Sequence, residues 1–178
     1  MQIANEYRQA VTTQNYTEKT TIDGVEIISQ PYHRDDTGNF TELVRLTDGT
    51  VEGLTGKAFT VRQASLSLLM PSVIKAFHFH ENQEDLWYVP PFNRIVANLV
   101  DLREDSTTKG NHLRVILGGN SNTLLRIPAG VAHGAGNLWH TPQTLIYFVT
   151  AQFNAEQPDE HRLPWDHFGS EMWEISRG

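Results

Sequence analysis

Three histidines and one glutamate have a spacing that suits metal binding or proton transfer. His78 and His80 are two residues apart, Glu84 follows shortly after, and His133 lies in a second polar segment. Residues two apart on a β-strand point to the same face, so His78 and His80 would present their rings together. With His133 on a neighbouring strand, three imidazole nitrogens and the Glu84 carboxylate would suit iron, manganese, nickel or zinc. The same histidines are equally suited to acid–base work without a metal.

Short β-strands separated by turns are the elements expected to hold these residues. From residue 22 onward, β-like runs are broken by turns rich in Gly, Pro, Asp and Asn, and helical periodicity is scarce. The expected strands cover residues 25–29, 40–46, 58–68, 76–80, 86–89, 94–101, 112–117, 123–127 and 143–153. This arrangement predicts an all-β sandwich or barrel.

Alternation along two of these strands collects polar side chains on one face. Gln63, Ser65 and Ser67 share a face, and His78 and His80 share a face opposite two phenylalanines. Such a face is either exposed to solvent or lines the polar interior of a barrel that holds a ligand. The alternation is compatible with both.

Composition excludes several classes of function. The chain has 178 residues, a net charge of −7 and no cysteine. The acidic balance argues against nucleic acid or anionic membranes as partners, and the lack of cysteine excludes disulfides and thiolate chemistry. The first residues form no signal peptide, and no stretch approaches the roughly 20 apolar residues of a membrane span. We therefore expect a soluble, cytoplasmic protein.

The chain is expected to form one domain. Residues 1–21 are polar and threonine-rich and are interpreted as a short N-terminal extension, and residues 22–178 as the domain itself. Its last part, from residue 158, looks irregular. Trp165, Phe168 and Trp173 are the side chains expected to anchor this tail on the rest of the domain.

The two histidine-containing segments resemble the paired motifs of the cupin superfamily. Residues 78–84 read His-x-His-x-x-x-Glu, and residues 128–137 read Pro-x-Gly-x-x-His-x-x-x-Asn. The resemblance implies a single jelly-roll β-barrel with a small-molecule site in its interior.

A longer series of segments resembles the dTDP-4-dehydrorhamnose 3,5-epimerase family, whose members are cupins that work without a metal. In order along the chain, the segments are DTGNFTE at 36–42, VRQASLS at 61–67, KAFH at 75–78, VDLR at 100–103, STTKG at 106–110, IPAGVAHG at 127–134 and YFVT at 147–150. The similarity runs from about residue 25 to residue 165.

This resemblance implies proton transfer beside a ketone. In a nucleotide-linked 4-keto-6-deoxy sugar, a base removes a proton next to the carbonyl, and an acid returns one to the opposite face of the resulting enolate. It implies His78 as the base, Tyr147 as the acid, no cofactor, and a homodimer. The substrate-binding positions that it implies are Glu42, Arg62, Gln63, Ser65, Lys75, His80 and His133, with Lys75 and Arg62 as candidates for the diphosphate.

Several positions differ from the family pattern. Asp85 lies near the place of a lysine that helps to hold the enolate, and an anion there would oppose an enolate. His80 stands where the family has glutamine. The family also orients its base with an aspartate near the C-terminus, for which Asp166, Glu171 and Glu174 are the candidates here.

These differences leave two alternatives to a metal-free epimerase or isomerase. One is a cupin that binds a sugar nucleotide without catalysing a reaction. The other is an oxygenase or isomerase that uses one divalent transition metal, with the ligands His78, His80, Glu84 and His133.

Overall fold

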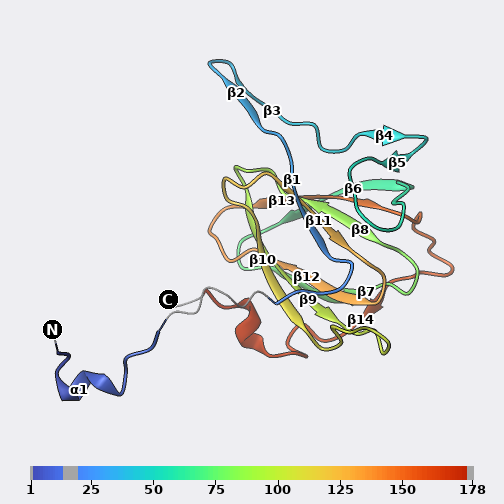
Figure 1. Cartoon of the computed structure of the whole chain (residues 1–178). Helices are drawn as coiled ribbons and strands as arrows, with labels where there is room; N and C mark the ends of the chain where they lie inside the picture. Colours follow the sequence, from blue (N-terminus) through green and yellow to red (C-terminus); the bar gives the residue numbers. More distant parts are fainter. Residues whose placement is uncertain (1, 14–19, 176–178) are drawn as a thin grey trace.

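Two antiparallel five-stranded sheets face each other in the computed structural model, which describes residues 2–13 and 20–175 (Figure 1). The first sheet contains, in spatial order, β1 (Glu26–Ser29), β11 (Thr123–Ile127), β8 (Asp85–Tyr88), β13 (Gln143–Val149) and β6 (Gln63–Leu69). The second contains β10 (His112–Gly118), β9 (Arg94–Asp101), β12 (Val131–Gly136), β7 (Ile74–Phe79) and β14 (His161–Arg162). The predicted all-β jelly-roll class is confirmed.

Smaller elements lie outside the two sheets. They are the hairpins β2 (His33–Asp35) with β3 (Gly38–Phe40) and β4 (Leu46–Thr47) with β5 (Thr50–Val51), the helix α1 (Asn5–Arg8) and the 3-10 helix η1 (Ser170–Trp173). We call the first hairpin the arm (residues 33–40), because it projects away from the sandwich in Figure 1. The expected N-terminal extension, residues 1–21, lies partly outside the described residues and stays a prediction.

Apolar side chains fill most of the space between the sheets. Trp87 and Leu125 from the first sheet pack with Ile95, Leu99 and Ala135 from the second, and all are buried. Burial of this kind is the main force that holds two sheets together.

Each sheet is also covered on its outer face, but by different parts of the chain. Phe59 and Val51, from the segment before β6, pack on Leu86 and Tyr88 of the first sheet. The C-terminal segment covers the second sheet. There Phe77 contacts the rings of Phe168 and Trp173, at centroid distances of 5.1 and 5.4 Å, and Met172 is buried beside them. Phe168 and Trp173 therefore anchor the tail as predicted, whereas Trp165 is exposed.

The predicted strands match the structure where alternation or apolar runs are strong. Strands β9 and β11 have the predicted bounds. The predicted strand at 40–46 is wrong in its middle, because β3 ends at Phe40 and β4 begins at Leu46. Outside the two sheets, the short strands β2 and β5 are not predicted, and within the sheets two further strands, β12 and β14, are not predicted either. Strand β12 is built of small residues, and β14 is only two residues long.

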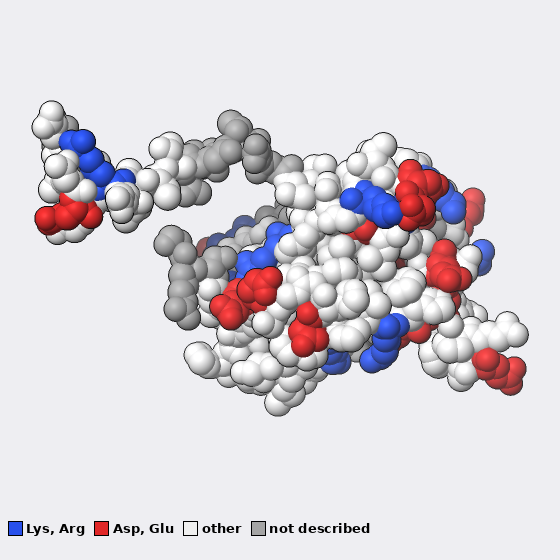
Figure 2. All heavy atoms as spheres, turned by 90° about the horizontal axis from the view of Figure 1, so that it is seen from below, with Lys and Arg blue, Asp and Glu red and all other residues white. Residues whose placement is uncertain are grey.

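The charges on the surface are mixed in sign. On the face seen in Figure 2, Lys and Arg side chains lie scattered among Asp and Glu side chains. Among the described residues, no helix is long and apolar enough to cross a membrane. The expected cytoplasmic location stays a prediction.

Candidate active site

A cavity of about 470 Å³ lies between the two sheets and is lined by side chains from both. Strand β7 contributes Lys75 and His78, and His80 follows directly after the strand. Strand β13 of the facing sheet contributes Tyr147. The polar face of β7 therefore lines the interior of the sandwich and does not face solvent.

Three histidine rings cluster at this cavity: His78 and His80 line it, and His133 is buried next to them. The ring centroid of His78 lies 4.3 Å from that of His133 and 5.7 Å from that of His80. His133 comes from β12, where it pairs with His78 across the strand ladder. Residues opposite each other on neighbouring strands project to the same face of a sheet, which explains why the two rings meet.

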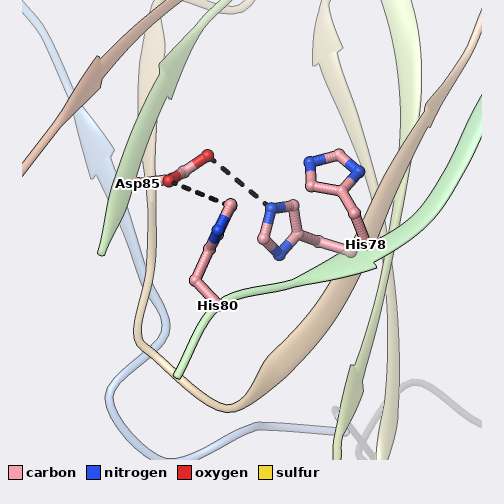
Figure 3. A group of neighbouring side chains, drawn as sticks. His78, His80 and Asp85 are labelled. Carbon is pink, nitrogen blue, oxygen red and sulfur yellow. Dashed lines mark ion pairs between the residues drawn. The ribbon is translucent and has the colours of Figure 1, made fainter. Parts of the chain in front are cut away.

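Asp85 lies beside this cluster, and polar groups occupy both of its carboxylate oxygens. One oxygen accepts a hydrogen bond from Gln83 Nε2 at 2.8 Å and lies 3.8 Å from His80 Nε2. The other accepts from Trp87 Nε1 at 3.0 Å and lies 3.6 Å from His133 Nε2. Figure 3 shows the Asp85 carboxylate directed at the imidazole rings rather than at open space.

The other ring nitrogens of His80 and His133 are held by the backbone. His133 Nδ1 lies 2.8 Å from the carbonyl oxygen of Val131, and His80 Nδ1 contacts the carbonyl oxygen of Asp159. A carbonyl oxygen only accepts hydrogen bonds, so both Nδ1 atoms carry hydrogen. The two Nε2 atoms are thereby directed toward Asp85.

His78 is held in its neutral form. Burial lowers the pKa of His78 far below its ordinary value, and the adjacent His133 lowers it further; Asp85 opposes them, and His80 and Arg162 add smaller lowering effects. A neutral imidazole has a free lone pair, so His78 is able to accept a proton from a ligand in the cavity.

Known relatives share this fold. The sequence model of the dTDP-4-dehydrorhamnose 3,5-epimerase family matches residues 19–173. The chain belongs to this family. Its membership confirms the expected enzyme class, a sugar-nucleotide epimerase or isomerase.

Individual known proteins are similar to this chain over most of its length. The spore coat polysaccharide biosynthesis protein SpsL of Bacillus subtilis is 48% identical over 145 residues, which cover 82% of this chain and 91% of SpsL. The structure of RmlC from Legionella pneumophila Philadelphia 1, in complex with dTDP-4-keto-L-rhamnose, is 27% identical with a TM-score of 0.70, covering 81% of this chain and 74% of RmlC. A Bacillus anthracis epimerase structure with TDP and PPi bound is 24% identical, covers 89% of this chain and 90% of its own, and shows the same fold with a TM-score of 0.72.

In this epimerase-family chain, the glutamate of the expected metal set lies away from the histidines. Glu84 binds Arg126 with contacts of 2.7 and 3.0 Å. Asp85 and Trp87 point into the interior, so Glu84, one residue earlier, points to the outer face of the sheet, as Leu86 does. The structure thus corrects the expected ligand Glu84 and puts Asp85 in its place.

The corrected group fits a divalent transition metal by donor type. His78, His80, Asp85 and His133 each offer one ligand atom, and these atoms lie within 4.8 Å of one another. Carbonyl groups that fix the Nδ1 hydrogens of two histidines are typical partners of metal-binding histidines. A metal held here would polarise a carbonyl oxygen of a ligand.

Some of the expected substrate-binding residues lie outside the residues that line the cavity. Glu42 is exposed beyond the arm and pairs with Arg45 at 3.1 Å. Arg62 is exposed just before β6. Gln63 and Ser65 bond to each other at 3.1 Å on the face of β6 that also carries the lining residue Ser67. The structure thus gathers Lys75, His78, His80 and Tyr147 at the cavity, with His133 buried next to His78, but not these four.

The acids considered as partners of the base also lie elsewhere. Asp166, Glu171 and Glu174 are exposed in the C-terminal segment. Asp85 is the acid whose charge acts on His78. In the sequence, Asp85 stands out only as a departure from the family pattern. Its position one strand residue before Leu86 and two before Trp87 was the available signal that it faces inward.

Proposed function

We propose that this protein epimerises or isomerises a nucleotide-linked 4-keto-6-deoxy sugar by proton transfer next to the ketone. One observation carries the proposal: His78 and Tyr147 line the same cavity from facing sheets. A sugar ring held between them would have a proton acceptor on one side and a hydroxyl donor on the other. Inversion at a carbon needs this arrangement, because the proton leaves one face and returns to the opposite one.

The proposed reaction has two steps. The neutral imidazole of His78 removes a proton from the carbon beside the carbonyl, and the electron pair of the broken C–H bond moves into an enolate. Tyr147 then donates its hydroxyl proton to the other face of that carbon, which restores the ketone with inverted configuration. Proton exchange with solvent returns both side chains to their starting forms. His80, which also lines the cavity, is proposed to contact the sugar, whereas His133 is buried next to His78 outside the lining residues.

The surroundings of Asp85 are compatible with an enolate nearby. A free carboxylate would repel an enolate, but the two oxygens of Asp85 accept hydrogen bonds from Gln83 and Trp87. Donors of this kind reduce the field that a carboxylate exerts on its neighbours. The expectation that Asp85 opposes the enolate therefore does not count against the proposal.

We propose that this chemistry needs no metal or other cofactor, since an acid and a base suffice for proton transfer. A homodimer is proposed as the working form. It is supported by the exposed leucines of β6 and by the arm, next to which Glu42 is exposed. In a dimer, Glu42 would be available to the ligand of the second copy.

Deuterium incorporation tests this function directly. Purified protein is incubated with dTDP-4-keto-6-deoxyglucose in D₂O, and deuterium at C3 and C5 is followed by NMR and mass spectrometry. We expect incorporation that His78→Asn reduces by at least about 100-fold, in keeping with the contribution of a general base. Tyr147→Phe should impair inversion more than the first exchange, because the proton acceptor remains. His140→Asn, a change at an exposed histidine, is the control.

The other outcomes separate the alternatives. Full exchange in His78→Asn would disprove its role as the base. Exchange that disappears with a chelator and returns with a divalent metal would favour the metal enzyme. Binding of the sugar nucleotide without any exchange would favour a different keto sugar or a non-catalytic binding protein.

A further inference from the structure

The short strand β14 brings an arginine to the mouth of the cavity. Arg162 pairs with His78 in the ladder between β14 and β7, so both side chains project from the same face of the sheet. Both residues line the cavity. Whereas His78 is largely buried, the side chain of Arg162 is 78% exposed, which puts its guanidinium at the opening.

Arg162 and Lys75 are the Lys and Arg side chains among the described residues that line the cavity. Lys75 donates a hydrogen bond from Nζ to Ser67 Oγ at 2.7 Å, across to the facing sheet. Arg162 makes an ion pair with Glu160 of the same segment. The deeper part of the cavity holds His78, Asp85 and Tyr147, whereas its exposed rim carries the two cations and Glu160.

This distribution of charge suits a ligand that is neutral at one end and anionic at the other. A sugar that reaches His78 leaves the attached diphosphate nearer the opening, where its negative charges need partners. A guanidinium binds phosphate oxygens through two parallel N–H donors, which makes arginine a strong and orienting contact. The Arg162–Glu160 pair is no obstacle, because exposed ion pairs contribute little and exchange partners readily.

We propose that Arg162 contacts the diphosphate of the nucleotide sugar and that Glu160 competes with the ligand for this guanidinium. The proposal rests on the proposed function, since it takes a nucleoside diphosphate sugar as the ligand. It replaces Arg62, the second cation that the sequence suggested, because Arg62 lies outside the residues that line the cavity. Lys75 keeps its expected part beside Arg162.

Calorimetric binding of dTDP to the full-length protein tests this inference. We expect Arg162→Ala to weaken dTDP binding by about tenfold or more, the usual effect of losing a charge-assisted hydrogen bond. The dTDP affinity of Arg162→Lys should lie between those of wild type and Arg162→Ala, because lysine keeps the positive charge but lacks the two parallel N–H donors of a guanidinium. Glu160→Gln should strengthen binding by a few-fold, because the competing carboxylate is removed. Lys109→Ala removes a cation paired with Glu104, which is not among the lining residues, and is the matched control.

Thymidine, which has no phosphate, checks that the contact is to the diphosphate. Its weak binding, followed by NMR, should be the same in wild type and Arg162→Ala. Unchanged dTDP affinity in Arg162→Ala, or a loss in Arg62→Ala instead, would overturn the inference. So would a wild-type protein that binds no dTDP. Binding that depends on Arg162 without any turnover would support the inference and contradict the proposed catalysis only.

Discussion

At the scale of single residues, the environment of a side chain decides its chemistry. His78 and the exposed His140 are the same residue type, but only His78 is buried beside two other histidines. Loss of water and two neighbouring imidazoles disfavour its charged form. The result is a neutral base in the interior of a protein that has no cysteine.

The lowered pKa of His78 should also make stability depend on pH. Below about pH 6.5, the unfolded chain takes up a proton at residue 78 that the folded chain does not bind. The free energy of unfolding should therefore fall as the pH falls, by up to about 1.4 kcal/mol per pH unit from this residue. Urea unfolding between pH 6.5 and 4.5 measures the slope, which His78→Asn should reduce by about one proton.

The pH range of this experiment ends at 4.5 so that two buried aspartates do not contribute to the slope. Asp85 and Asp101 have lowered pKa values, so the stability that they provide is lost only at lower pH. His140→Asn is the control and should keep the wild-type slope. Equal slopes in wild type and His78→Asn would show that residue 78 takes up its proton in the folded state.

At the scale of elements, the site depends on the close approach of β12 to β7. A Cβ added to Gly134 would lie 2.2 Å from Ala76 Cβ and 2.9 Å from its Cα, distances that real side chains do not reach. The absence of a side chain at Gly134 thus lets the backbones meet where His133 and His78 pair. The small residues of β12 give no clear strand pattern in the sequence, but they allow this strand to pack closely against β7.

Gly134→Ala should therefore destabilise the protein by about 1–3 kcal/mol, the usual cost of overpacking. It should also lower activity, because β12 and β7 would separate and move His133 away from His78. Thermal or urea unfolding measures the first effect and the deuterium assay the second. Adding Ala76→Gly should restore part of the stability, since it removes the nearest clashing atom. A Gly134→Ala protein with wild-type stability and activity would show that β12 and β7 adjust to the added methyl group without separating.

At the scale of the whole molecule, the edge strand β6 has polar side chains on its inner face and apolar side chains on its outer face, the reverse of the usual arrangement. Its polar residues Gln63, Ser65 and Ser67 face inward and are partly buried, whereas Leu66 and Leu68 are 64% and 52% exposed on the outer face. Edge strands and exposed apolar patches are the usual places for pairing with a second copy. The reversal supports the proposed homodimer.

Sedimentation velocity at micromolar concentration tests the homodimer. We expect a species of twice the 20.2 kDa chain mass, which a Leu66→Asp, Leu68→Asp double variant converts to monomer with unchanged circular dichroism. Burying two carboxylates in an apolar interface is costly, which is the reason for the expected loss. Phe92→Asp, a change at another exposed apolar residue, should leave the dimer intact. A monomeric wild type would contradict the homodimer.

The local pattern of the chain determined its class and much of the site. Short alternating runs predicted the all-β fold, and the resemblance of the ordered motifs to the epimerase family predicted His78, His133 and Tyr147 as site residues, since strand periodicity and motif order are properties of the sequence itself. Period-two alternation also separated His78 and His80 from Phe77 and Phe79. These features depend on neighbours along the chain, so the sequence contains them.

Only the tertiary structure decided which side chains share the cavity. Glu84 and Asp85 are adjacent acids, and the pairing of β8 in the first sheet determines that Asp85 meets the histidines while Glu84 binds Arg126. Arg162 reaches the site because β14 adds to the edge of β7, a contact between residues 84 positions apart (162 against 78). Strand pairing of this kind depends on the packing of the whole sandwich, which no local pattern of residues reports.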